Sequence, residues 1–91
     1  MTAYVIEKTV GDKKTYVNFD YNLFWSTSVL SAYFYPTKES AEEDIPRLMK
    51  RENNIEDTKP ELMAKGIIKN DPNYVKPKIS MCVREVEVNI K

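Results

Sequence analysis

The segment 33–49 constrains the fold most, because an aromatic run meets a proline there and a helical pattern follows at once. Pro36 cannot donate a backbone hydrogen bond and biases Tyr35 towards an extended conformation, so a strand is expected to end there. Thr37 has the side chain of a helix N-cap, and acidic residues in the turns that follow suit the positive end of the helix dipole. The segment therefore predicts a strand over 29–35, followed by a helix that starts after Thr37.

Prolines complicate the rest of this helical region. In a continuous helix Pro46 would cost about 3 kcal/mol. Either it kinks one helix, or Asp44 caps a fresh segment that holds Pro46 in its first turn. Residues 58–61 match a capping box that starts a second, short helix over about 59–65, with Gly66 as its left-handed terminator. The face of the first helix that should pack on the sheet consists of Ala41, Ile45, Leu48 and Met49.

Other apolar patterns predict strands around the helical region. Residues 3–10 and 15–19 are rich in β-branched and aromatic side chains and flank a turn at 11–14, which predicts a hairpin. Alternation along the first strand places Glu7 on the face away from the core. Residues 20–28 begin with turn-forming side chains and are expected to form a loop.

The last strand is expected over 79–90, where apolar residues alternate in two sets of opposite phase. The first set is Ile79, Met81 and Val83, and the second is Val86, Val88 and Ile90. A strand does not switch its buried face without an extra residue or a bend, so the change of phase predicts a β-bulge or a change of partner at Arg84-Glu85. The second half is then free to pair with the N-terminal strand or with another subunit, which makes a homodimer through the C-terminal strand a candidate assembly.

The length of 91 residues and the apolar content of 42% suit a single domain, because a chain of this size buries one core. We expect residues 1–91 to form one α+β domain with a mainly antiparallel sheet of three to four strands. One kinked helix and one short helix should pack on one face, in the order β-β-β-α-α-β. The 14 basic and 14 acidic side chains cancel, so no overall field attracts nucleic acid or membrane lipid.

The same sequence predicts a cytoplasmic protein. No apolar run approaches the roughly 20 residues that a membrane span needs. The N-terminus lacks a basic region followed by an apolar one, so no secretion signal is expected. The single cysteine, Cys82, cannot form an internal disulfide, which is consistent with a reducing compartment.

Side chains that carry catalysis are scarce. Histidine is absent, which removes the commonest general base and the usual zinc ligand. Two glycines cannot form a glycine-rich phosphate loop. An acidic cluster lacks the spacing of a calcium loop and is expected to be a solvated helix face; it consists of Glu39, Glu42, Glu43 and Asp44. We therefore expect a protein that is not an enzyme and has no metal or cofactor.

Aromatic residues crowd into 16–35, which holds eight of the ten in the chain. They could form an aromatic core, bind a protein partner, or stack bases of single-stranded nucleic acid beside Lys13 and Lys14. Balanced charge counts against nucleic acid, so a protein-interaction module is the leading hypothesis and single-stranded nucleic-acid binding the alternative. The candidate binding patch is Tyr21, Phe24, Trp25, Tyr33 and Tyr35.

Three stretches carry a resemblance to known proteins: YVIEK at 4–8, SAYFYPTKESAEED at 31–44, and VREVEVNIK at 83–91. Their order resembles that of small orphan proteins of phages and prophages in Gram-positive bacteria. The resemblance implies a short accessory protein that binds and modulates a host or phage protein. It assigns no functional residue.

Overall fold

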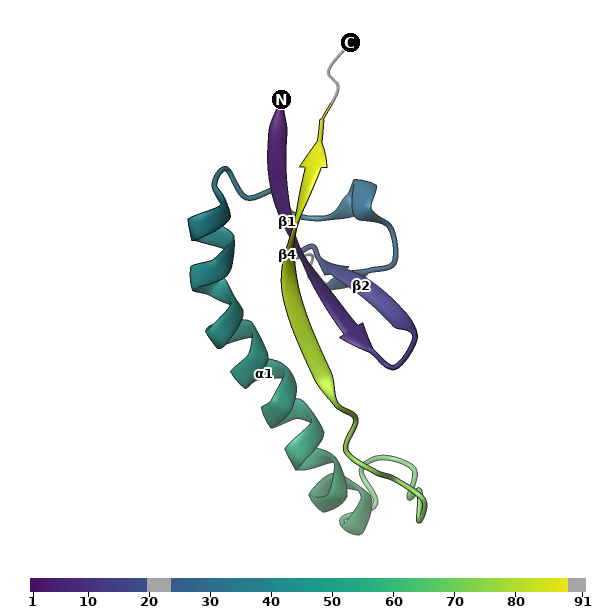
Figure 1. Ribbon diagram of the computed structural model, residues 1–91. Coiled ribbons are helices and arrows are strands. Elements are labelled where there is room, and N and C mark those ends of the chain that lie inside the picture. The colour runs from purple at the N-terminus through teal and green to yellow at the C-terminus, as the bar shows by residue number, and fades with distance from the viewer. Residues whose placement is uncertain (20–23, 89–91) are drawn as a thin grey trace.

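The computed structural model describes residues 1–19 and 24–88, which form a four-stranded antiparallel sheet and one long helix (Figure 1). The strands are β1 (Thr2–Val10), β2 (Lys13–Val17), β3 (Trp25–Ser26) and β4 (Ile79–Glu87), in the sheet order β3-β2-β1-β4. Between β3 and β4 lie a 3-10 helix, η1 (Val29–Ser31), and an α-helix, α1 (Lys38–Ala64). The predicted α+β class and antiparallel sheet are confirmed, and Figure 1 shows α1 and η1 on opposite sides of the sheet.

The predicted hairpin is formed by β1 and β2. Val10 pairs with Lys13, so Gly11 and Asp12 make a two-residue connection. Gly11 has a φ of 60°, the conformation that the first central position of a type II′ turn requires and that glycine adopts without strain. The turn thereby sets the register of the two strands.

Both ends of α1 follow local sequence signals. The Thr37 Oγ1 accepts a hydrogen bond from the Ser40 backbone N at 3.1 Å, which confirms the predicted N-cap. At the other end Gly66 has a φ of 72° and the Ile67 backbone N donates to the Leu62 carbonyl oxygen at 3.0 Å. This is the Schellman arrangement, so Gly66 is the predicted left-handed terminator.

The prediction of two helices is wrong, because α1 continues through Pro46 and Pro60. Pro60 has no N–H for the Glu56 carbonyl oxygen four residues earlier. The Tyr74 hydroxyl lies 3.1 Å from that oxygen and can donate to it instead. Thr58, the expected cap of a second helix, donates its hydroxyl to the Ile55 carbonyl oxygen at 2.9 Å. A residue 18 positions from Glu56 thus stabilises the helix across Pro60.

The strand predicted over 29–35 is also wrong. Its first residues form η1, because the Ser28 Oγ accepts a hydrogen bond from the Leu30 backbone N at 3.3 Å and caps a turn. Tyr35 forms an isolated bridge to the sheet through a pair of backbone hydrogen bonds with Tyr4 of 2.7 and 3.1 Å, and the Tyr33 backbone N donates to the Val17 carbonyl oxygen at 2.8 Å. The third strand is instead β3, which lies within the predicted loop over 20–28.

The predicted β-bulge at Arg84-Glu85 is wrong as well, because β1 and β4 pair in one unbroken register from Thr2↔Glu87 to Val10↔Ile79. The change of apolar phase has another cause. Met81 and Val83, in the first half of β4, pack against the core beneath α1. Val86, on the other face, lines a groove with the segment around η1. The apolar residues in the first half of β4 therefore face α1, and Val86 in the second half faces the segment around η1.

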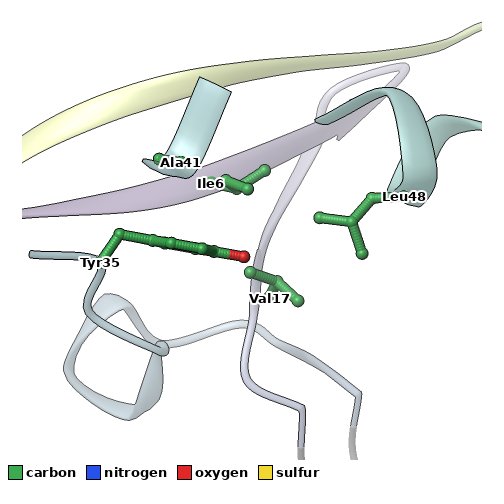
Figure 2. Close-up of a cluster of buried hydrophobic side chains, with 5 residues drawn as sticks. All are labelled: Ile6, Val17, Tyr35, Ala41 and Leu48. Atoms are coloured by element: carbon green, nitrogen blue, oxygen red, sulfur yellow. The ribbon is translucent and has the colours of Figure 1, made fainter. Parts of the chain in front are cut away.

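The main core lies between the sheet and α1. Figure 2 shows the buried side chains that meet there, which are Ile6, Val17, Tyr35, Ala41 and Leu48. Ala3 and Val5 on the opposite face of β1 are also buried, so the central strand is covered on both faces. None of the helices in 1–19 and 24–88 has the length and apolarity to span a bilayer.

Glu7 was expected on an exposed face and is buried. Its Oε1 lies 3.3 Å from the Arg84 guanidinium and 3.3 Å from the Lys14 Nζ, while the Tyr16 hydroxyl donates to Oε2 at 3.1 Å. Burial alone would raise the pKa of Glu7, but the hydrogen bonds from Arg84, Tyr16 and Lys14 outweigh it and lower the pKa. A buried carboxylate therefore joins β1, β2 and β4.

Candidate functional site

Five aromatic side chains from neighbouring segments form a series of ring contacts at one side of the sheet. We call them the aromatic cluster: Phe19, Phe24, Trp25, Tyr33 and Tyr35. Phe19 follows β2, Trp25 begins β3, and Tyr33 lies between η1 and α1. The cluster brings together four members of the predicted patch. The fifth member, Tyr21, lies outside the described residues.

Phe19 is the centre of the cluster. Its ring centroid lies 5.4 Å from that of Phe24, 5.1 Å from that of Tyr33 and 6.4 Å from that of Tyr35. Phe24 continues the series to Trp25, 5.7 Å away. All of these contacts are edge-to-face, the geometry in which the positive edge of one ring meets the negative face of another. The rings are therefore held in fixed relative orientations.

The Phe19 backbone is strained. Its φ of 60° is the only positive value at a non-glycine residue in 1–19 and 24–88. A residue without a special tolerance for this region is held there at a cost of about 1–3 kcal/mol, and such residues are concentrated at functional sites. The Phe19 side chain keeps 36% of its surface exposed despite its three ring contacts. The strained backbone therefore presents a partly exposed aromatic ring at the centre of the cluster.

Exposure differs widely among the members of the cluster. Tyr35 is a core residue with 6% exposure, whereas Tyr33 is 46% exposed. The Tyr35 hydroxyl donates to the Asp44 Oδ2 at 2.5 Å, and burial together with this carboxylate raises the pKa of Tyr35. Tyr35 is therefore a support for the cluster, and the accessible part is Phe19 and Tyr33 with the partly buried Phe24 and Trp25.

Cationic side chains lie over three of the rings. The Arg51 Cζ is 3.8 Å from the Phe24 centroid, and the Arg47 Cζ is 5.8 Å from the Phe19 centroid. These positions match cation–π contacts, each worth about 0.5–2 kcal/mol depending on solvation. Arg47 is also fixed by Asp44, whose Oδ1 lies 2.8 Å from its Nε. The guanidinium of Arg47 lowers the pKa of Asp44.

The third cation belongs to a buried ion pair that we did not predict. The Lys8 Nζ lies 4.3 Å from the Trp25 ring centroid and 2.7 Å from the Glu52 Oε1, and both charged side chains are largely buried. Glu52 also pairs with Arg51. The burial of Glu52 had one signal in the sequence: Glu52 lies four residues after Leu48, on the apolar face of α1. No comparable signal identifies the backbone conformation of Phe19.

Across residues 1–19 and 24–88, acidic and cysteine side chains form no group of three that could hold a metal ion. The site is thus an array of oriented aromatic rings and fixed cations. Its chemistry suits contact with apolar or aromatic groups of another molecule.

No family model, curated protein or solved structure matches the chain.

Proposed function

We propose that the chain is a non-enzymatic protein-interaction module whose binding surface is centred on Phe19 and Tyr33. The observation that carries this proposal is the strained backbone of Phe19, which presents a 36% exposed ring within a series of edge-to-face contacts. Aromatic and arginine side chains are enriched in protein interfaces and contribute much of their binding energy. Here both kinds of side chain lie together, with Arg47 over Phe19.

The fixed geometry of these rings favours binding. A side chain that is ordered before association loses little conformational entropy when a partner covers it. Phe19 is held by Phe24 and Tyr33, and Arg47 is held by Asp44. We infer a partner that inserts apolar or aromatic side chains against these rings. The resemblance to phage and prophage proteins extends the proposal to an accessory protein that binds a host or phage protein in the bacterial cytoplasm.

Single-stranded nucleic acid is the alternative ligand. The exposed rings of Phe19 and Tyr33 beside Arg47 favour it, because bases stack on aromatic side chains next to cations. Two observations count against nucleic acid: Arg47 is already paired with Asp44, and the chain has zero net charge. A labelled oligonucleotide at about 50 mM salt tests it, since electrostatic contacts to phosphate are strongest at low salt.

A second copy of the chain is another candidate partner. Strand β4 lies at the edge of the sheet, and Val86 and Val88 line an apolar groove of about 410 Å³ with Leu30 and Phe34. Leu30 is 86% exposed. A dimer through β4 would cover this groove, and light scattering tests it: a dimeric mass that Leu30→Ser converts to a monomeric one supports the dimer, and a monomeric wild-type mass excludes it.

A pair of variants on opposite faces tests the proposed surface. Tagged wild-type protein, Tyr33→Ser and Leu30→Ser are used to capture proteins from a Gram-positive bacterial lysate with and without nuclease. We expect Tyr33→Ser to lose a protein that wild type and Leu30→Ser retain in both conditions. Loss with Leu30→Ser alone would move the interface to the groove, and loss after nuclease treatment would favour nucleic acid.

A further inference from the structure

We propose that the segment 65–78, which connects α1 to β4, docks on the surface of a membrane that contains anionic lipid. Figure 1 shows this segment at the opposite end of the molecule from the N-terminus and the end of β4. The structure describes every residue of the segment, and none of them is buried. The molecule is elongated, with extents of 51 × 24 × 24 Å, so its end can contact a flat surface.

Three aliphatic side chains of this segment are exposed. Ile67 is 65% exposed, Ile68 37% and Val75 81%. A Schellman motif usually packs the residue after its glycine against the last turn of the helix, here Ile67 against Leu62. Ile67 follows Gly66 in that motif, yet most of its side chain stays in water. Capping of α1 therefore does not account for the apolar surface of the segment.

Hydrogen bonds hold the segment in this conformation. The Tyr74 hydroxyl donates to the Glu56 Oε2 of α1 at 2.7 Å, and the Tyr74 backbone N donates to the Asp71 carbonyl oxygen at 3.1 Å. The Asn73 backbone N donates to the Asp71 Oδ1 at 2.9 Å. Val75, which follows Tyr74, is therefore presented to solvent before binding. Such preorganisation reduces the conformational entropy that is lost when a partner covers the side chain.

Although the chain has zero net charge, this segment is basic. It holds four lysines, Lys65, Lys69, Lys76 and Lys78, and one carboxylate, that of Asp71. Lys69 and Lys78 make no ion pair within the part of the chain that the structure describes. Anionic lipid headgroups attract lysines that lie near the membrane surface. The segment therefore combines aliphatic side chains with cations, the two contributions on which binding to a membrane surface depends.

The other two lysines have partners on α1. The Lys65 Nζ lies 2.9 Å from the Glu61 Oε1, and the Lys76 Nζ lies 2.7 Å from the Asp57 Oδ1. All four of these side chains are about half exposed or more, and exposed pairs of this kind are weak. Both ammonium groups can therefore turn to lipid phosphates. Even with these two carboxylates and that of Asp71 counted, four lysines face three acids, so the charge stays positive.

The composition of the segment favours lipid over a protein partner. Protein interfaces are enriched in tryptophan, tyrosine and arginine and depleted in lysine. The segment has four lysines but no arginine, tryptophan or phenylalanine. Its single aromatic side chain, Tyr74, is held by Glu56. A lipid surface accepts aliphatic side chains without a shaped pocket, and its anionic headgroups complement the lysines.

This surface is separate from the aromatic cluster. Arg51, which lies over the ring of Phe24, is about 21 Å from Lys65 along the axis of α1. Contact between the segment and a membrane therefore leaves the cluster accessible. Neither proposal depends on the other.

Sedimentation with lipid vesicles tests the proposal. Wild-type protein would be mixed, at about 100 mM salt, with vesicles of phosphatidylcholine alone or of phosphatidylcholine with about one third phosphatidylglycerol. We expect the protein to sediment with the anionic vesicles and to bind the neutral ones at least about fivefold more weakly. No sedimentation, or equal sedimentation with both kinds of vesicle, would overturn the proposal.

Matched variants show whether the segment is responsible. Ile67→Ser and Lys69→Gln should each weaken binding to the anionic vesicles about fivefold, because each removes one contact with lipid. Leu30→Ser removes an aliphatic side chain that is 86% exposed outside the segment, and Lys50→Gln removes an exposed lysine of α1. Both controls should bind as wild type does, and all four proteins should keep its circular dichroism spectrum. Equal weakening by the controls would contradict a docking segment at 65–78.

A second copy of the chain would give a different result. If the exposed side chains of the segment pair with those of another copy, light scattering without vesicles should report a dimer. Ile67→Ser would then give a monomer, whereas Leu30→Ser would not. This outcome would overturn the lipid proposal, and a mass that Ile67→Ser leaves unchanged supports it.

Discussion

The Nζ of Lys8 lies 2.7 Å from the Oε1 of Glu52, and this buried contact ties the central strand β1 to the middle of α1. The two residues are 44 positions apart in the chain. Removing one partner of a buried pair leaves an uncompensated charge, whereas replacing both with apolar groups is often neutral. The pair therefore constrains how α1 sits on the sheet, and its two members should respond very differently to single and double substitution.

We expect Glu52→Gln to lower the free energy of unfolding by about 3 kcal/mol, because Lys8 would stay buried without its carboxylate. The double variant Lys8→Met with Glu52→Leu should recover most of that loss. Urea unfolding monitored by circular dichroism measures both. A double variant that is less stable than Glu52→Gln would show that the apolar environment does not accept these side chains.

The substitution Phe19→Asn should abolish partner binding while changing the stability of the fold only slightly. Asparagine tolerates a positive φ better than phenylalanine does, so relief of backbone strain offsets part of the lost ring contacts. We expect a change in unfolding free energy within about 1 kcal/mol and a loss of partner capture. Urea unfolding and affinity capture report the two quantities. Unchanged capture by a folded Phe19→Asn protein would place the interface elsewhere.

The hydroxyl of Tyr74 should matter more when residue 60 is proline. Tyr74→Phe leaves the Glu56 carbonyl oxygen without a donor and should cost about 1–2 kcal/mol. In a Pro60→Ala background the backbone N–H of the introduced alanine supplies that donor, so the same substitution should cost less. A double-mutant cycle by urea unfolding measures the difference. An equal cost in both backgrounds would assign the effect to the Glu56 carboxylate, whose Oε2 lies 2.7 Å from the hydroxyl.

Acid should destabilise the protein partly through Glu7. Its pKa is lowered in the folded state, so the unfolded chain binds more protons over the range in which this carboxyl titrates. The resulting stabilisation is complete above the ordinary carboxyl pKa, about 4.3, and is lost as the pH falls through the lower folded value. Urea midpoints from pH 6 to pH 3 should fall less steeply for Glu7→Gln than for wild type, and parallel curves would contradict this role.

The features that were predicted correctly from the sequence depend on short-range chemistry. Gly11 in the hairpin, Thr37 at the N-cap and Gly66 at the C-terminus each act on residues within a few positions. Two of the incorrect predictions depend on distant contacts: Tyr74 supports the helix across Pro60, and the segment around η1 covers Val86. No local pattern contains that information.

In the candidate site, too, some features could be predicted from the sequence and others depend on the assembled fold. The crowding of aromatic residues predicted a cluster, and the structure brings Phe24, Trp25, Tyr33 and Tyr35 into one series of contacts. Tyr35 belongs to the core because it pairs with Tyr4, and Phe19 is the centre of the cluster because its positive φ directs its ring there. Both are properties of the assembled sheet.

Photo-crosslinking from the aromatic cluster tests the proposed interface most directly. Benzoylphenylalanine would replace Tyr33 in one protein and Glu61 in a control, since Glu61 is exposed near the far end of α1, about 21 Å along the helix from Arg47. Illumination in a nuclease-treated bacterial lysate should join position 33 to one protein that position 61 does not label. The same products from both positions, or none from position 33, would contradict a protein-binding surface at Phe19 and Tyr33.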